Sequence, residues 1–335
     1  MGTPRAQVIR RGVSGSREGL ANRSLHNMCK GLTMSWIRDW AKKDLVDEVL
    51  RAQEIIALIW PRTANFPDLP NIDYHVRIQP LGACMGGDLA YIVNFSDHGL
   101  AKRIDQASNA GNRALESHLS KNRDSLGIMI ADASGHMIAD GIAISNLYAA
   151  LDMAIDYELD MHGEITAGLF TRLNEKFVHW LAPDFIRRKP YVTFLYGEIH
   201  DDGKFRYVKG GHPDPIYFSH ADDKVVKLTG RREGSTALGV DPAVFRLDVD
   251  TFGNNGEFLV NEIQLLGKGD ILLLYTDGLT EQAAGDMSFC DTKLEEVLRE
   301  HKSGTAAEIY DAVWKGLHAY CPPDDDVTIA VIKKL

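Results

Sequence analysis

The stretch Gly127-Ile128-Met129-Ile130-Ala131-Asp132 is an apolar run that ends in an aspartate, and a turn, Ala133-Ser134-Gly135-His136, follows it. A second run, Ile271-Leu272-Leu273-Leu274-Tyr275, likewise leads into Thr276-Asp277-Gly278. Short apolar runs bounded by glycine and aspartate are typical of buried strands. The two stretches therefore predict strands that each present a carboxylate at one end.

The remaining strands and helices indicate the class of the fold. Predicted strands come in consecutive runs, and helices predicted over residues 138–161, 165–181, 293–300 and 306–319 bracket those runs. This order favours an α+β protein with antiparallel sheets. A further strand is predicted over 245–249, and residues 97–123 are polar enough to be an insertion or a marginal helix.

Composition excludes several classes of protein. Hydrophobic residues make up 44% and charged residues 25% of the 335 positions, as in ordinary globular chains. The formal charge of −10 disfavours a nucleic-acid-binding body. The four cysteines form no CxxC pair, so we expect a reduced, cytoplasmic setting.

The N-terminal part of the chain divides into two segments. Residues 1–33 contain six Lys and Arg and a single acidic residue, Glu18, which predicts a flexible basic tail. Residues 34–61 contain no Gly and end at Pro61, and the apolar positions from Leu45 to Ile59 step by four and three, which predicts a helix with one apolar face. That face could pack on its own domain or mediate self-association, and the pattern leaves both open.

Acidic residues stand at the ends of four predicted strands. Asp88 follows Gly86-Gly87 ahead of a strand, Asp132 and Asp277 end strands, and Asp325 with Asp326 precedes the strand from Val327. Each one alone is more often a turn former than a ligand. If the strand ends converge, however, Mg²⁺ or Mn²⁺ would relieve the repulsion between the carboxylates.

Five segments carry a resemblance to a known family: Gly86-Gly87-Asp88, Ile130-Ala131-Asp132-Ala133-Ser134-Gly135-His136, Gly210-Gly211-His212-Pro213, Gly269-Asp270 with Leu274-Tyr275-Thr276-Asp277-Gly278-Leu279-Thr280-Glu281, and Asp325-Asp326-Val327-Thr328. In this order they resemble the SpoIIE/RsbU-type serine phosphatases, a bacterial branch of the PP2C (PPM) metal-dependent protein phosphatases. The resemblance runs from about Asp47 to Leu335.

The resemblance implies a four-layer α-β-β-α sandwich of two antiparallel sheets, with the N-terminal helix ahead of a phosphatase domain over 70–335. It also implies two Mn²⁺ or Mg²⁺ ions. Asp88 and Asp132 would bridge them, the Ala133 carbonyl, Asp277 and Asp325 would complete the ligand set, and Asp326 could exchange roles with Asp325. The ions would activate a water that attacks the phosphorus of phosphoserine or phosphothreonine. Residues expected to support the site or shape the substrate loop are Gly87, His136, Gly211, His212, Gly278 and Thr328.

The same resemblance suggests a role in partner-switching signalling. The substrate class would be a phosphorylated anti-sigma-factor antagonist, and a regulatory protein or a second copy could bind through the helix over 45–59. Leu89-Ala90-Tyr91 and Met137 depart from the family pattern. They motivate an alternative, a non-catalytic module of the same fold that binds a partner through the N-terminal helix. A third possibility is an enzyme that acts on a small phosphoester.

Overall fold

The computed structural model describes residues 50, 51, 54, 67–81, 86–135, 138–180, 190–226, 228, 236–240, 258–265, 267–284 and 287–335. Of the helix predicted over 34–61, only Leu50, Arg51 and Glu54 are described, and these three are helical and exposed. The tail over 1–33, the strand predicted over 245–249, His136 and Met137 lie outside the described residues.

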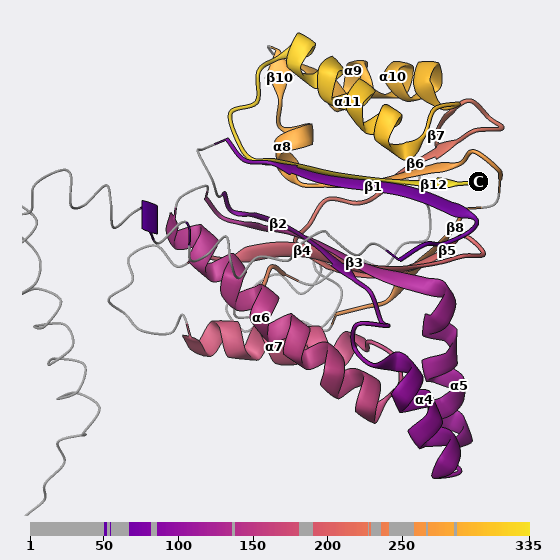
Figure 1. The fold of residues 1–335 in the computed structure, drawn as a ribbon. Coiled ribbons are helices and arrows are strands. Elements are labelled where there is room, and N and C mark those ends of the chain that lie inside the picture. The colour runs from indigo at the N-terminus through magenta and orange to yellow at the C-terminus, as the bar shows by residue number, and fades with distance from the viewer. Residues whose placement is uncertain are drawn as a thin grey trace, which may run out of the picture. The chain divides into compact units, whose positions relative to one another are not determined.

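Two five-stranded antiparallel sheets form the centre of the fold (Figure 1). The first has the order β1-β12-β9-β6-β7 and the second β2-β3-β4-β5-β8. The first comprises β1 (Ile72–Gln79), β6 (Ile216–Ser219), β7 (Lys224–Val226), β9 (Ile271–Tyr275) and β12 (Val327–Lys334). The second comprises β2 (Asp88–Val93), β3 (Ser125–Ala133), β4 (Val192–His200), β5 (Lys204–Gly210) and β8 (Asn261–Gln264). The short strands β10 (Ala283–Ala284) and β11 (Met287–Ser288) pair separately.

Helices cover the outer face of each sheet (Figure 1). On the second sheet lie α6 (Ile138–Met161) and α7 (Ala167–Trp180), and on the first lie α10 (Leu294–His301) and α11 (Ala306–Tyr320). The short helices α8 (Asp277–Thr280) and α9 (Phe289–Thr292) precede α10. Three apolar clusters fill the spaces between the layers. Two of them lie between a sheet and its helices, and the third lies between the two sheets. The predicted α-β-β-α sandwich is confirmed.

Local sequence explains why these elements form. The strands β3, β9 and β12 are buried along nearly their whole length because helices cover one face and the other sheet covers the opposite face. Along α6, Ile144, Leu147, Leu151, Ile155 and Leu159 recur at helical spacing and are all fully buried. Glu308 and the Thr305 side chain form a capping box that starts α11.

Residues 97–123 fold into two helices that pack against α6. They are α4 (Leu100–Asn109) and α5 (Arg113–Lys121), followed by the 3₁₀ turn η1 (Asn122–Asp124). Leu100, Ile104 and Ala107 form the buried face of α4. With so few apolar side chains, much of the contact is polar.

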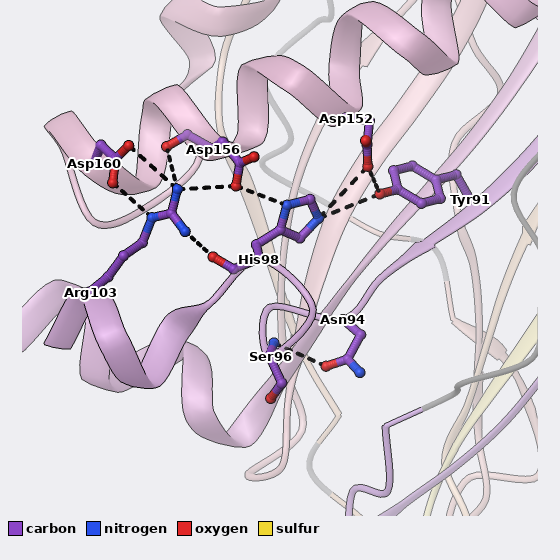
Figure 2. A network of polar contacts seen from close by, with 8 residues as sticks. All are labelled: Tyr91, Asn94, Ser96, His98, Arg103, Asp152, Asp156 and Asp160. Atoms are coloured by element: carbon purple, nitrogen blue, oxygen red, sulfur yellow. Dashed lines mark hydrogen bonds and ion pairs between the residues drawn. The ribbon is translucent and has the colours of Figure 1, made fainter. Parts of the chain in front are cut away.

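Figure 2 shows this polar contact between α4, β2 and α6. Arg103 of α4 forms ion pairs with Asp156 at 3.1 Å and with Asp160 at 2.8 Å. The Tyr91 hydroxyl donates a 2.5 Å hydrogen bond to Asp152. Because aspartates four residues apart lie on one face of a helix, α6 offers a row of acceptors to the preceding segment.

Candidate metal centre

Asp88 and Asp132 lie opposite each other on neighbouring strands. Asp88 begins β2 and is the cross-strand partner of Asp132 near the end of β3. Directly opposed residues project from the same face of a sheet with their Cβ atoms about 5 Å apart. The fold therefore brings together two carboxylates that are 44 positions apart in the sequence.

Burial and mutual repulsion perturb both acids. Asp88 is 1% exposed, and burial raises its pKa to about 8, with Asp326 and Asp277 adding to the effect. Burial also raises the pKa of Asp132 to about 9, and the charge of Asp88 is the next largest cause. Neither carboxylate forms an ion pair with a Lys or Arg among the described residues. In this state the pair favours protons, which a metal cation would displace.

Two threonines from the other sheet hold Asp88. The hydroxyls of Thr276 and Thr328 both donate to its Oδ2 atom, at 2.8 and 2.7 Å. These hydrogen bonds oppose the burial effect on the pKa because they favour the charged form. No described residue donates to Oδ1, so this oxygen is the one left for another ligand.

Asp277 joins the pair from the end of β9. It follows Thr276, begins α8 and lies close enough to Asp132 for its charge to raise the pKa of that carboxyl. Burial raises the pKa of Asp277, with the charges of Glu281 and Asp325 adding to it. The adjacent Gly278 allows close approach of two backbones, because a Cβ there would lie 2.0 Å from the carbonyl oxygen of Asp326.

Asp325 and Asp326 have different surroundings. Asp326 is 3% exposed, and its two oxygens accept hydrogen bonds from the backbone N–H groups of Leu81 and Gly87, at 2.7 and 2.6 Å. Asp325 is more exposed, and its Oδ1 accepts from the N–H of Asp326. Each Asp326 oxygen thus accepts one backbone hydrogen bond and keeps a further lone pair, and the interchange with Asp325 expected from sequence stays a prediction.

Gly87 joins the turns that carry Asp88 and Asp132. Its carbonyl accepts a hydrogen bond from the N–H of Ala133, and the Ala133 carbonyl in turn accepts one from Gly135 at 2.6 Å. A Cβ at position 87 would lie 2.2 Å from the Gly135 oxygen. The Ala133 carbonyl has a second lone pair, so this hydrogen bond does not prevent it from acting as a ligand.

His212 lies behind the acidic group, not among its members. Its Nδ1 atom is 2.9 Å from the hydroxyl of Thr193, which is the cross-strand partner of Asp132. Burial lowers the pKa of His212 to about 3, which keeps the ring neutral at physiological pH. Gly211 precedes it with a φ of +62° and forms a bridge to Phe194, so this turn shapes the loop.

The donor set fits a hard divalent cation, since carboxylate and carbonyl oxygens are the ligands that Mg²⁺ and Mn²⁺ prefer. Within the described ranges, however, no three acidic, histidine or cysteine side chains already converge on one point as a metal-ion ligand set. The structure thus brings Asp88, Asp132 and Asp277 together and places Asp325 and Asp326 close enough to raise the pKa of Asp132.

Sequence reasoning missed the partners of these acids. Thr276 and Thr193 were not identified as supports, although the Thr-Asp-Gly motif contains the first of them. Gly86 was also missed, and a Cβ there would overlap the Asp326 carboxylate. Its position beside Gly87 was the available signal, because paired glycines often mark a close backbone approach.

Comparison with known proteins identifies the family. The family model described as Stage II sporulation protein E (SpoIIE) matches residues 122–334. The chain belongs to the SpoIIE family. A curated relative of this SpoIIE-family chain is the phosphoserine phosphatase RsbU of Bacillus subtilis (strain 168), 25% identical over 226 residues, which cover 65% of this chain and 58% of RsbU. The match therefore spans less than two thirds of that relative.

Solved structures show the same fold. The PP2C domain of SiaA from Pseudomonas aeruginosa matches with a TM-score of 0.60 and 18% identity, over 87% of this chain and 98% of that domain. The RsbU and RsbW domains of Rv1364c from Mycobacterium tuberculosis match with a TM-score of 0.55 and 19% identity, over 80% of this chain and 61% of the other. At these identities the likeness extends to the fold alone. Among the described helices, none has the length and apolar character to cross a membrane.

Proposed function

We propose that this SpoIIE-family chain is a metal-dependent phosphatase that hydrolyses phosphoserine or phosphothreonine in a protein substrate. The observation that carries the proposal is the opposed pair of Asp88, which is buried and accepts hydrogen bonds from Thr276 and Thr328, and Asp132, which is partly buried, with no cationic side chain paired to either among the described residues. Uncompensated carboxylates are costly to bury unless they bind a cation or a proton. The family and the name of the relative RsbU support phosphoester hydrolysis.

The proposed ligands are Asp88, Asp132, the Ala133 carbonyl, Asp277 and Asp325, and they would hold two Mn²⁺ or Mg²⁺ ions. When bound, such ions activate water and neutralise the phosphoryl oxygens. Asp326 fixes the turn before Asp88 through Gly87, so its role is to position the site.

The chain's own residues control the protons of the site. The Thr276 and Thr328 hydroxyls orient Asp88 and favour its ionised form, so they prepare it to exchange a proton for a cation. Burial raises the pKa of Asp277, and burial together with the charge of Asp88 raises that of Asp132, so both carboxyl groups hold protons more tightly than usual until a cation arrives. Because His212 is neutral and buried, it serves as a positioning residue behind Asp132 and does not donate a proton.

The proposed substrate is a phosphorylated anti-sigma-factor antagonist in a partner-switching pathway. One similar structure combines an RsbU domain with an RsbW domain, which supports this class of partner. Regulation by a partner or a second copy through the helix over 45–59 stays a prediction, as does the cytoplasmic location expected from the cysteines.

Phosphate release from a phosphoserine protein, with and without Mn²⁺, tests the proposal. We expect chelator to abolish turnover, and Asp132→Asn and Asp277→Asn to reduce it by about 10²-fold or more, because the ligand set loses charge. Asp324→Asn is the matched control, since this exposed neighbour of Asp325 accepts a hydrogen bond from Gln282 and from no other side chain in the described part of the chain. Turnover that is indifferent to metal and to both variants would refute the proposal.

Two further results separate the alternatives. Stoichiometric capture of a partner without any turnover would favour a non-catalytic module. Faster hydrolysis of a small phosphoester than of the phosphoprotein would favour a metabolic enzyme.

A further inference from the structure

A second polar site lies at the opposite end of the β2-β3-β4-β5-β8 sheet from the acidic pair. A cavity of about 620 Å³ opens where the helix layer ends, lined by the ends of α5 and β4 and the start of β5. Asp124 lines it, whereas Asp132 lies near the far end of β3. At 3.3 Å per residue the two positions are about 26 Å apart along the strand.

The lining of this cavity contains a buried carboxylate whose nearest cationic group is too far away to form a hydrogen bond. Glu198 of β4 is 4% exposed, and among described residues its one hydrogen bond comes from the Tyr196 hydroxyl at 3.3 Å. The nearest guanidinium nitrogen, Nη1 of Arg206, is 3.9 Å from its Oε2 atom, beyond hydrogen-bond range. A buried carboxylate with such weak compensation marks a place where a cation would be stabilised.

Arg206 is shared among three acids. Its Nη1 donates to Glu164 at 3.2 Å, its Nε lies 3.7 Å from Glu262, and Glu198 takes only the longest contact. Lys204 is also occupied, because its Nζ pairs with Glu262 at 3.0 Å. Arg206 and Lys204 are thus already committed to carboxylates, which leaves Lys121 as the one lining cation without an ion pair among the described residues.

Charge and size together define the class of ligand. The lining contains six carboxylates against three Lys and Arg side chains. The volume falls in the range of small-molecule sites. Among the described residues, the carboxylates of this lining do not converge on one point. An organic cation can instead span carboxylates that lie apart.

We propose that this cavity binds a small organic cation that carries primary amines or a guanidinium group. One ammonium contacts the buried Glu198, and Glu164 and Glu262 receive the remaining donors. The two histidines of the lining, His118 and His200, contribute the rim. The site is independent of the proposed phosphatase chemistry, because none of its residues belongs to the acidic strand ends.

Calorimetric titration of the full chain tests the proposal, with spermidine and L-arginine as organic cations and inorganic phosphate as the anion. Saturating Mn²⁺ is kept in the cell so that the acidic strand ends do not compete. We expect saturable one-to-one binding of at least one organic cation, whereas phosphate, which the proposed metal ions attract, should bind equally to the unmodified chain and to Glu198→Gln. Glu198→Gln and Glu164→Gln should each weaken that binding about tenfold, because each removes a charged hydrogen-bond acceptor.

A matched variant separates the site from general attraction to an acidic protein. Glu175 lies on α7, is exposed and does not line the cavity, so Glu175→Gln removes the same charge elsewhere. The affinity of Glu175→Gln for the organic cation should equal that of the unmodified chain. Glutamine is nearly isosteric with glutamate, and unchanged melting temperatures would show that the variants fold. Absence of binding by both cations, or equal weakening by all three variants, would overturn the proposal.

Discussion

The replacement Gly87→Ala should separate the geometry of the acidic pair from its chemistry. A Cβ at position 87 would lie 2.2 Å from the Gly135 oxygen and 3.0 Å from that of Ala133. Ordinary contact begins near 3.4 Å, and both neighbours are backbone, so the two turns must move apart by about 1 Å. The change adds no charge and removes no ligand, and its effect therefore comes from displacement alone.

The expected losses follow from that displacement. A shift of about 1 Å at a catalytic centre costs about 10²-fold in rate, which corresponds to about 2.7 kcal/mol in the activation barrier. Overpacking of this kind also lowers the free energy of unfolding by about 1–3 kcal/mol. We expect kcat/KM on a phosphoprotein to fall by that factor and Mn²⁺ affinity to fall with it.

The assay combines three measurements: phosphate release, Mn²⁺ calorimetry and urea denaturation. Gly168→Ala is the control, because this exposed glycine of α7 has only ordinary contacts at 3.4 Å and beyond. The control should keep full activity. If Gly87→Ala folds and retains both wild-type turnover and wild-type Mn²⁺ affinity, the close approach of the two turns is irrelevant to the site and the reasoning fails.

Three further changes have defined outcomes. Thr328→Val removes a hydrogen bond that lowers the pKa of Asp88, so the acid limb of the pH–rate profile should move up by about one pH unit; an unmoved limb contradicts this. The folded-state pKa of Asp132 is raised to about 9, so in chelator the unmodified chain should lose stability as pH rises from about 4 to 9. Asp132→Asn has no such carboxyl group, and its melting temperature should fall less over this range. Melting temperatures of the two proteins that change in parallel with pH would exclude this explanation. Arg103→Ala should lower the free energy of unfolding by about 1 kcal/mol in urea titrations, whereas Lys102→Ala, an exposed neighbour, should have no effect, and equal losses would show that the ion pairs of Arg103 contribute nothing.

The bounds of some apolar elements could be predicted closely from the sequence. The helix over 138–161 and the strand Ile271–Tyr275 have the same bounds in the structure, because the helix is apolar and contains no Pro and the strand is one unbroken apolar run between Asp270 and Thr276. Aspartates at strand ends could be located in the same way. That Asp88 and Asp132 face each other depends on the register of β2 and β3, which sequence spacing does not specify.

Other features depend on distant contacts and could not be predicted. The segment over 100–121 has few apolar residues, and its helices are stabilised partly by pairing between Arg103 and aspartates more than 50 positions away. The distinct surroundings of Asp325 and Asp326 arise from the backbone of Leu81 and Gly87, which only the folded chain brings near. Local pattern contains no information on such pairs.

The hydrogen bond from Thr328 to Asp88 joins residues 240 positions apart. At a synthesis rate of 5–20 residues per second, Asp88 leaves the ribosome's catalytic centre roughly 12–48 s before Thr328 is added. During this interval a nascent chain has no β12, so its pocket is incomplete. Delayed assembly of this kind leaves the acidic strand ends incomplete until translation has passed β12.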